Sequence, residues 1–168
     1  AWQVMSATLT YAADLIPEIA DNVADVDDAM KLGYAWKQGP FELIDKIGAA
    51  WLAERLAVEG RDVPEFLKLA ADKGGFYRVA EGRLQYLATD GGYVTVARAP
   101  GVLLLADVKR AGAPIHGNGS ASLWDIGDGV ACLEFHSKMN AIDPDTLAMI
   151  GQSVAAVGKD YKALVLHN

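Results

Sequence analysis

Cysteine, long apolar runs and positive charge are all scarce in this sequence of 168 residues. The single cysteine, Cys132, cannot form a disulfide framework within the chain, and it excludes a cysteine-rich zinc site for the same reason. An unpaired thiol suits a reducing compartment, which favours the cytoplasm. The longest apolar run, residues 101–106, is far shorter than the roughly 18 residues of a membrane-spanning helix, so we expect no membrane span.

Acidic residues outnumber basic ones, and the whole excess lies in one part of the chain. The 15 Lys and Arg against 22 Asp and Glu give a net charge of −7. Residues 1–72 hold 13 acidic and 6 basic side chains, whereas residues 73–168 hold 9 of each. An acidic segment repels the phosphodiester backbone, so we expect no nucleic-acid partner. The change in charge indicates two modules joined in one chain.

Residues 1–72 repeat apolar side chains at helical intervals, and a hydrophobic content of 52% is sufficient for a buried core. The first predicted helix carries an apolar stripe at Val4, Thr8, Tyr11, Leu15 and Ile19, with Met5, Leu9, Ala12 and Ile16 beside it. Pro17 should end or kink this helix, because its ring clashes with the carbonyl group four residues earlier. The whole segment predicts four or five helices joined by short connections.

Capping residues predict the limits of the second helix. Asp25 is the expected N-cap of a helix over residues 26–32, and Gly33 is its expected C-cap. Asp27 and Asp28 then fall in the first helical turn, where the helix dipole favours acidic side chains. We therefore interpret this acidic pair as helix N-terminal charges and not as catalytic groups.

Glycine and proline divide the remainder of the helical segment. Pro40 follows Gly39 and is expected at the first position of a helix whose apolar face begins at Phe41. Gly48 should end that helix, and Pro64 should begin the last short one.

The apolar period changes in residues 73–120. Three short β-prone runs surround Glu81-Gly82 and Asp90-Gly91-Gly92, which favour turns because glycine accepts a positive φ freely. This pattern predicts a small β-meander that connects the two ends of the chain. Residues 103–109 fit either a short helix or a buried strand, and residues 111–120 have the composition of a linker.

Residues 121–168 predict a β-hairpin, a helix and a strand, in that order. The hairpin turns at Gly127-Asp128-Gly129. Asp143 is expected to cap the helix, which carries at helical spacing Leu147, Ile150, Val154 and Val157. Residues 162–167 form a mostly apolar strand that is suited to burial on both faces.

No catalytic or metal-binding motif is assembled by the sequence. The three histidines lie 20 and 31 residues apart and form no short ligand pair, so we expect no metal at His116, His136 or His167. The Gly127-Asp128-Gly129 segment is similar in letters to the start of a dinucleotide-binding turn. It lies inside a predicted hairpin and opens no helix, so we interpret it as a turn.

Residues 25–48 resemble the C-terminal helical domain of 3-hydroxyacyl-CoA dehydrogenases. The resemblance rests on the segments D-D-A-M-K-L-G and G-P-F-E-L-I-D-K-I-G. In that family the domain closes over the substrate and mediates dimerisation, so the resemblance implies a substrate or domain-interface role for Gly39, Pro40 and Phe41. The first helix lacks the family's Asn-Arg pair, and it is similar to the second, duplicated copy of this domain in long dehydrogenases.

Residues 121–168 resemble the N-terminal part of a crotonase, or enoyl-CoA hydratase, domain. Residues 129–135 match its early strand, and the segment H-S-K-M-N-A-I that follows resembles the loop beside bound coenzyme A. The resemblance implies coenzyme A contacts by Lys138, Met139, Asn140 and Ala141. This chain departs from the family in having His-Ser in place of Arg-Pro and one residue fewer between Lys and Asn.

Together these observations predict a mixed α and β fold in three parts. An all-α dehydrogenase C-terminal-type domain spans residues 1–72, a β-rich connector spans 73–120, and an incomplete α/β crotonase-like unit spans 121–168. The chain does not begin with Met, and we interpret it as a piece of a longer protein. The resemblance implies a fatty-acid β-oxidation parent that oxidises 3-hydroxyacyl-CoA with NAD and hydrates enoyl-CoA.

In both families the catalytic groups lie outside the segments matched here, so no catalytic residue is assigned. The implied partners are acyl-CoA and other domains of the parent: the nucleotide-binding domain, the first helical domain and the rest of the crotonase domain. Self-association through residues 121–168 is also expected, because the last strand has an unpaired apolar edge. The alternatives are a non-catalytic module that packs and orients neighbouring domains, and a free-standing acyl-CoA-binding protein.

Overall fold

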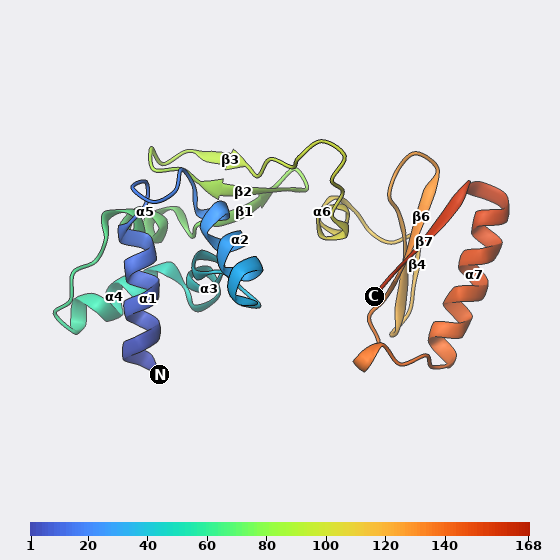
Figure 1. Ribbon diagram of the computed structural model, residues 1–168, viewed down its shortest axis with the longest axis horizontal. Coiled ribbons are helices and arrows are strands. Elements are labelled where there is room, and N and C mark those ends of the chain that lie inside the picture. Colours follow the sequence, from blue (N-terminus) through green and yellow to red (C-terminus); the bar gives the residue numbers. More distant parts are fainter. The chain divides into compact units, whose positions relative to one another are not determined.

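The chain folds as two separate units in a computed structural model, which describes residues 1–168 apart from the side chain of Asn140 (Figure 1). Unit 1 spans Ala1–Arg98 and unit 2 spans Ala99–Asn168. This division differs from the boundaries expected at residues 72 and 120. Residues 73–98 pack with the helices instead of connecting two domains, because Phe76 and Leu87 are fully buried in the helical core.

Unit 1 contains five helices followed by an antiparallel sheet. The helices are α1 (Trp2–Asp14), α2 (Val23–Tyr34), α3 (Pro40–Ile47), α4 (Ala49–Val58) and α5 (Glu65–Lys73). The sheet has the order β1-β2-β3, with strands β1 (Tyr77–Ala80), β2 (Arg83–Leu87) and β3 (Tyr93–Thr95). The predicted helical segment and the predicted β-meander are both confirmed.

Three phenylalanine rings hold the centre of unit 1. The Phe41 and Phe76 ring centroids are 4.8 Å apart, and those of Phe66 and Phe76 are 5.1 Å apart, both in edge-to-face geometry. Phe41 belongs to α3, Phe66 belongs to α5, and Phe76 immediately precedes β1. The rings therefore join two helices to the start of the meander.

The limits of α2 differ from those expected. Its N-cap is Asn22 and not Asp25, because the Asn22 side chain accepts a hydrogen bond of 3.0 Å from the Asp25 backbone N–H. The helix also continues through Gly33 to Tyr34, and its C-cap is Ala35, which takes the left-handed conformation (φ 54°). The helix thus begins three residues earlier than expected, so the acidic residue in its first turn is Asp25 and not Asp27 or Asp28.

The buried face of α1 is not the expected stripe. Val4 and Tyr11 of that stripe are 69% and 66% exposed, and the helix ends at Asp14, ahead of Pro17. The buried face is instead the adjacent one, formed by Ser6, Leu9, Ala12 and Ala13. This face is rich in small residues, and it packs against α3 and α5.

Unit 2 has one four-stranded sheet of order β4-β5-β6-β7. Its elements are α6 (Leu105–Ala111), β4 (His116–Gly117), β5 (Ala121–Asp125), β6 (Val130–Phe135), the 3₁₀ turn η1 (Lys138–Asn140), α7 (Pro144–Asp160) and β7 (Ala163–His167). β5 and β6 form the predicted hairpin, and β7 is parallel to β6, which the α7 crossover makes possible.

The structure adds detail in two segments of unit 2, one whose secondary structure the sequence left open and one expected to be a linker. The segment that fitted either a helix or a strand is helical and forms α6. The expected linker contains β4, which pairs antiparallel with β5. Two residues carry too little pattern to be recognised as a strand, and the pairing with β5 is what defines it.

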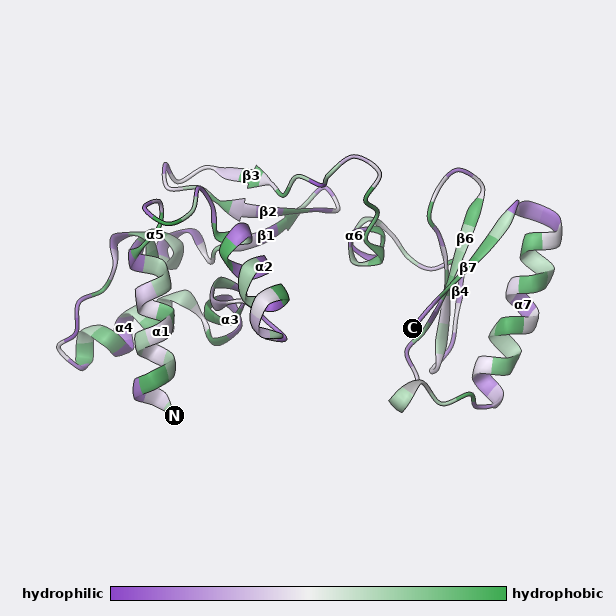
Figure 2. Cartoon of the chain, viewed as in Figure 1, coloured by the Kyte–Doolittle hydropathy of each residue, from purple (hydrophilic) through white to green (hydrophobic). Residues whose placement is uncertain are grey.

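Helix α7 covers one face of this sheet. Its buried residues are Thr146, Met149 and Ser153, and Met149 packs with the sheet residues Ala121, Leu123, Ala131 and Leu133. Figure 2 shows α7 mostly in the colours of hydrophobic residues between more polar ends. Two of the apolar residues that marked this helix in the sequence, Leu147 and Val154, point away from the sheet. The described helices include none that is long and apolar enough to span a membrane.

Replacing Phe41 with alanine should destabilise unit 1 by about 3–5 kcal/mol, because the ring is fully buried and contacts Phe76. Denaturant unfolding followed by circular dichroism measures this change. Val58→Ala on α4 is the matched control, since Val58 is 74% exposed and the change should cost no more than about 0.5 kcal/mol. Equal effects of the two substitutions would contradict the assignment of Phe41 to the core.

Candidate functional site

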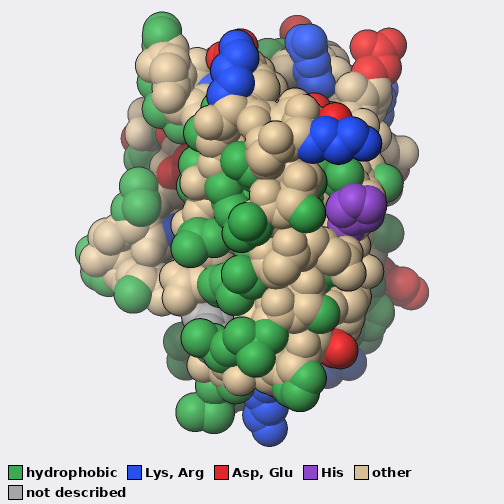
Figure 3. Space-filling model, turned by 90° about the vertical axis from the view of Figure 1, so that its right-hand side faces the viewer, with side chains coloured by type: hydrophobic (Ala, Val, Ile, Leu, Met, Phe, Trp, Pro, Cys, Tyr) green, Lys and Arg blue, Asp and Glu red, His purple; other side chains and the backbone are tan. Residues whose placement is uncertain are grey.

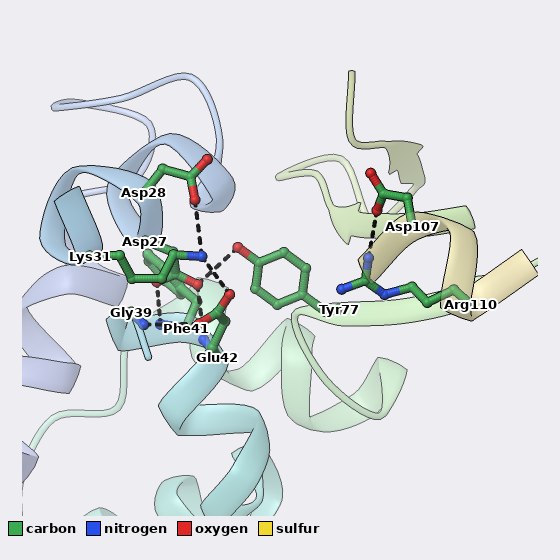
Figure 4. A network of polar contacts seen from close by, with 9 residues as sticks. All are labelled: Asp27, Asp28, Lys31, Gly39, Phe41, Glu42, Tyr77, Asp107 and Arg110. Atoms are coloured by element: carbon green, nitrogen blue, oxygen red, sulfur yellow. Dashed lines mark hydrogen bonds and ion pairs between the residues drawn. The ribbon is translucent and has the colours of Figure 1, made fainter. Parts of the chain in front are cut away.

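A buried carboxylate on α2 organises the polar contacts between α2, α3 and β1 (Figure 4). Asp27 is fully buried. Its oxygens accept hydrogen bonds from the backbone N–H groups of Phe41 (2.8 Å) and Glu42 (3.0 Å) and from the hydroxyl of Tyr77 (2.9 Å). The two N–H groups belong to the first turn of α3, where they lack helical partners. Asp27 therefore caps α3 from a neighbouring helix, which corrects its expected role as a first-turn charge of α2.

Gly39 and Pro40 shape the start of α3 around this carboxylate. A Cβ atom on Gly39 would lie 2.3 Å from the Asp27 carboxyl group, so no larger residue fits without a shift. Pro40 occupies the first helical position, as predicted, and lacks an N–H group to satisfy. Glu42 completes the cap by accepting hydrogen bonds from the Gly39 backbone N–H (3.0 Å) and from Lys31 (2.7 Å).

Burial controls the electrostatics of this cluster, which we call the Asp27 cluster (Asp27, Lys31, Gly39, Glu42 and Tyr77). Burial raises the pKa of Asp27 from 3.8 to about 6, against the opposing effect of its three hydrogen bonds. Burial and the adjacent carboxylate together raise the pKa of the Tyr77 hydroxyl. Carboxyl groups with a shifted pKa can act as general acids or bases in active sites. Here the carboxylate oxygens are enclosed and already hold three donors, so the cluster supports the fold.

A second carboxylate fixes the entry into the meander. Asp45 of α3 accepts hydrogen bonds of 2.7 Å from the backbone N–H groups of both Phe76 and Tyr77. Burial raises the pKa of Asp45, and its two hydrogen bonds oppose this. Sequence analysis missed both carboxylate roles, because each joins residues that are between 14 and 50 positions apart. Within the described part of the chain, every buried side-chain nitrogen or oxygen has a hydrogen-bond partner.

The structure places Gly39, Pro40 and Phe41 together, at the start of α3. All three are buried within unit 1, against α2 and the Phe76 ring. Within unit 1, Gly39 and Phe41 therefore contact other residues of the same unit, namely Asp27 and Phe76. A substrate or domain-interface role for them stays a prediction.

The four residues predicted to contact coenzyme A also lie together, in the loop between β6 and α7. Lys138 and Met139 are exposed, and Met139 takes a positive φ of 59° with its side chain 92% exposed. Ala141 follows and is exposed as well. The side chain of Asn140 lies outside the described residues. Because β6 and β7 are parallel, their carboxyl ends share the sheet edge from which this loop leaves, a position where α/β sheets commonly bind ligands.

Hydrogen bonds to a neighbouring strand hold this loop in place. The backbone N–H groups of His136 and Ser137 donate to the Ser120 carbonyl oxygen at 2.9 and 3.1 Å. The Ser137 hydroxyl donates to the Ala141 carbonyl oxygen at 2.7 Å, which closes the turn. The His136 Nε2 atom lies 2.9 Å from the Ser122 hydroxyl. These hydrogen bonds hold the two ends of the loop in place, while Lys138 and Met139 between them are exposed to solvent.

The Gly127-Asp128-Gly129 segment does not form a dinucleotide-binding turn. Gly127, Asp128 and Gly129 form the turn between β5 and β6, with φ values of 90°, 55° and 76°, and no helix follows them. They therefore lack the helix N-terminus that receives a pyrophosphate group. The residues that the structure describes also contain no group of three or more His, Cys, Asp or Glu side chains arranged to hold a metal ion.

Comparison with known proteins matches residues 3–94 to the family described as 3-hydroxyacyl-CoA dehydrogenase, C-terminal domain. The matched segment includes the β-meander, as unit 1 does. Across 99% of its length the chain is 41% identical to a protein of Bacillus subtilis (strain 168) named "Probable 3-hydroxyacyl-CoA dehydrogenase", of which it covers 21%.

Two rickettsial proteins match a shorter stretch of 42 residues, which is 25% of this chain. Those of Rickettsia felis and Rickettsia prowazekii are 50% and 40% identical there, and each is named "Putative fatty acid oxidation complex trifunctional enzyme". The stretch covers 6% of each protein. The chain therefore spans about a fifth or less of the length of these relatives.

The raised pKa of Asp27 predicts a pH-dependent stability. The folded unit binds this proton more tightly than the unfolded chain, so the stabilisation is present below about pH 4 and is lost as the pH rises through about 6. The unfolding free energy should fall by up to about 3 kcal/mol across this range. Asp27→Asn should remove most of this slope, as measured by denaturant unfolding at successive pH values.

Two comparisons make this test specific. Asp72→Asn, at an exposed position on α5, should leave the slope unchanged. A smaller slope of the same sign should persist in Asp27→Asn, because burial also raises the pKa of Asp45. If Asp27→Asn retained the full slope of the wild type, the assignment to Asp27 would be wrong.

Proposed function

The chain belongs to the 3-hydroxyacyl-CoA dehydrogenase family through its C-terminal domain, and we propose that it is part of a multidomain enzyme of fatty-acid β-oxidation. The observation that carries this proposal is the 41% identity along 99% of the chain to one protein named as such a dehydrogenase. That match runs through both units, so it supports a parent in which a dehydrogenase C-terminal domain is followed directly by unit 2. The rickettsial names support the same kind of parent.

The proposed parent oxidises 3-hydroxyacyl-CoA to 3-oxoacyl-CoA and uses NAD as the hydride acceptor. NAD would bind in a nucleotide-binding domain outside this chain, because Gly127 and Gly129 form a hairpin turn and open no helix. Unit 2 would be the start of a crotonase domain that hydrates enoyl-CoA. The order of hairpin, helix and parallel strand supports this, as does the loop of Lys138 to Ala141 at the carboxyl end of β6.

Within this parent, the chain would act as a packing and positioning segment. Its buried carboxylates are occupied by backbone donors at the start of α3 and β1, which leaves them with structural roles. Its partners would be the nucleotide-binding domain, the first helical domain and the rest of the crotonase domain, with acyl-CoA as the shared ligand. A location in the cytoplasm, which the single thiol favours, belongs to the same proposal.

The second candidate is a non-catalytic module that only packs and orients domains of an acyl-CoA-handling protein. The observation in its favour is the loop itself, which has His136-Ser137 where the crotonase family has Arg-Pro. The two candidates differ in whether the parent hydrates enoyl-CoA, and a hydration assay on the parent separates them.

The isolated chain should form no NADH from 3-hydroxyacyl-CoA and NAD, whereas the parent protein should. The reason is that the Gly127-Asp128-Gly129 turn opens no helix, and the buried carboxylates of Asp27 and Asp45 already accept hydrogen bonds from backbone donors. The assay follows NADH absorbance with equal molar amounts of the two proteins. Turnover by the isolated chain would overturn the assignment of catalysis to other domains, and an inactive parent would overturn the proposed dehydrogenase.

Lys138→Ala in the parent should weaken coenzyme A binding to its crotonase domain about tenfold, since a lysine–phosphate contact contributes a charge-assisted hydrogen bond. Isothermal titration calorimetry with coenzyme A measures the dissociation constant. Lys159→Ala, at an exposed position near the end of α7, is the matched control and should leave the constant unchanged. Unchanged binding in Lys138→Ala would remove this loop from the coenzyme A site.

A further inference from the structure

The outer face of α7, opposite the face that covers the sheet, has the composition of a buried helix surface. It is formed by Leu147, Ala148, Gly151, Val154, Ala155 and Gly158, and all six are exposed. Leu147 is 60% exposed and Val154 is 61% exposed. Figure 3 looks onto this side of the molecule and shows hydrophobic side chains gathered along it. A helix that is apolar on all sides is normally covered on all sides.

Two glycines on this outer face have no explanation within the unit. Gly151 and Gly158 lie inside α7, where glycine is the least favourable residue apart from proline. A Cβ atom added at either position would meet nothing within 4 Å. This contrasts with Gly39, where Asp27 leaves no room. Glycine also permits close approach of another backbone, which here would have to come from outside the unit.

The spacing of large and small residues on this face is self-complementary. Leu147, Gly151, Val154 and Gly158 follow one another at intervals of four, three and four residues, which is the spacing of a helix-packing seam. The pairs Leu147/Gly158 and Gly151/Val154 have the same midpoint in the sequence. Two antiparallel copies of α7 centred on that midpoint therefore place each large side chain opposite a glycine of the other copy.

The net charge of the two ends of α7 favours the same antiparallel arrangement. The N-terminal end of α7 carries Asp143 and Asp145, whereas its C-terminal end and the next residues carry Lys159 and Lys162, with Asp160 between them. Asp143 and Lys162 share the midpoint of the seam, and so do the two acidic residues Asp145 and Asp160. The charge that favours the antiparallel arrangement is therefore the net charge of each end, which is −2 for Asp143 and Asp145 and +1 for Lys159, Asp160 and Lys162. An antiparallel pair thus brings each acidic end beside the basic end of the other copy, whereas a parallel pair would bring like ends together.

We propose that the outer face of α7 is a docking surface for a second copy of this chain, joined as a two-fold antiparallel helix pair. A second copy is the occupant because the large and small residues are self-complementary about one point, as a two-fold interface requires, and because the two ends of α7 carry opposite net charge. The seam is only about three turns long, so the buried area is small and the dimer is weak and concentration-dependent. This pairing does not depend on the proposed enzymatic role.

Sedimentation equilibrium of the full chain over a range of concentrations tests the pairing. The wild type should fit a monomer–dimer equilibrium, and Val154→Lys should raise the dissociation constant at least about tenfold, because it places a charge in the centre of the seam. Val58→Lys, on exposed α4, is the matched control and should leave the constant unchanged. Val165→Lys, on the open edge of the sheet at β7, should also leave it unchanged.

A second pair of variants separates association from folding. Gly151→Ala and Gly33→Ala both place a methyl group in open space inside a helix, so both should raise the melting temperature. Only Gly151→Ala should also weaken the dimer, because its methyl group fills the space for the partner's Val154. A chain that stays monomeric at all concentrations overturns the proposal. Dissociation by Val165→Lys but not by Val154→Lys would also overturn it, in favour of pairing through β7.

Discussion

The burial of one carboxylate, that of Asp27, is the constraint on which the arrangement of unit 1 depends. A charged group removed from water is costly unless hydrogen-bond donors surround it. Asp27 meets this requirement with two backbone N–H groups of α3 and the Tyr77 hydroxyl of β1. Those same N–H groups would otherwise be unpaired at the start of a buried helix. The carboxylate of Asp27 and the first N–H groups of α3 thus satisfy each other's need for a hydrogen-bond partner. This mutual pairing holds α2, α3 and β1 together.

Asp45 extends this arrangement to the start of the β-meander. It satisfies the N–H groups of Phe76 and Tyr77, where the chain leaves α5 and enters β1. Phe76 then packs between the rings of Phe41 and Phe66. The meander is therefore attached to the helices by both polar and apolar contacts. This explains why the family match continues to residue 94 and why the physical boundary lies at 98.

Features decided by neighbouring residues could be predicted from the sequence, whereas features decided by distant partners could not. The Gly39-Pro40 helix start, the hairpin turn at residues 127–129 and the Asp143 cap each depend on a few adjacent residues. The role of Asp27 depends on donors up to 50 positions away. For the candidate sites, the sequence located both segments and placed Phe41 on an apolar helix face, but it could not show that Met139 is open to solvent.

Helix α7 shows why an apolar pattern can mislead when a helix has two apolar faces. In the sequence, Leu147, Ile150, Val154 and Val157 form one plausible stripe. In the fold, Ile150 and Val157 pack toward the sheet, whereas Leu147 and Val154 point outward. The expected stripe therefore combined residues from two different faces. A helix with a single apolar face would not give this result, because its remaining positions would be polar. The unexplained glycines fall on the outward face, which is the face whose composition the fold of unit 2 does not require.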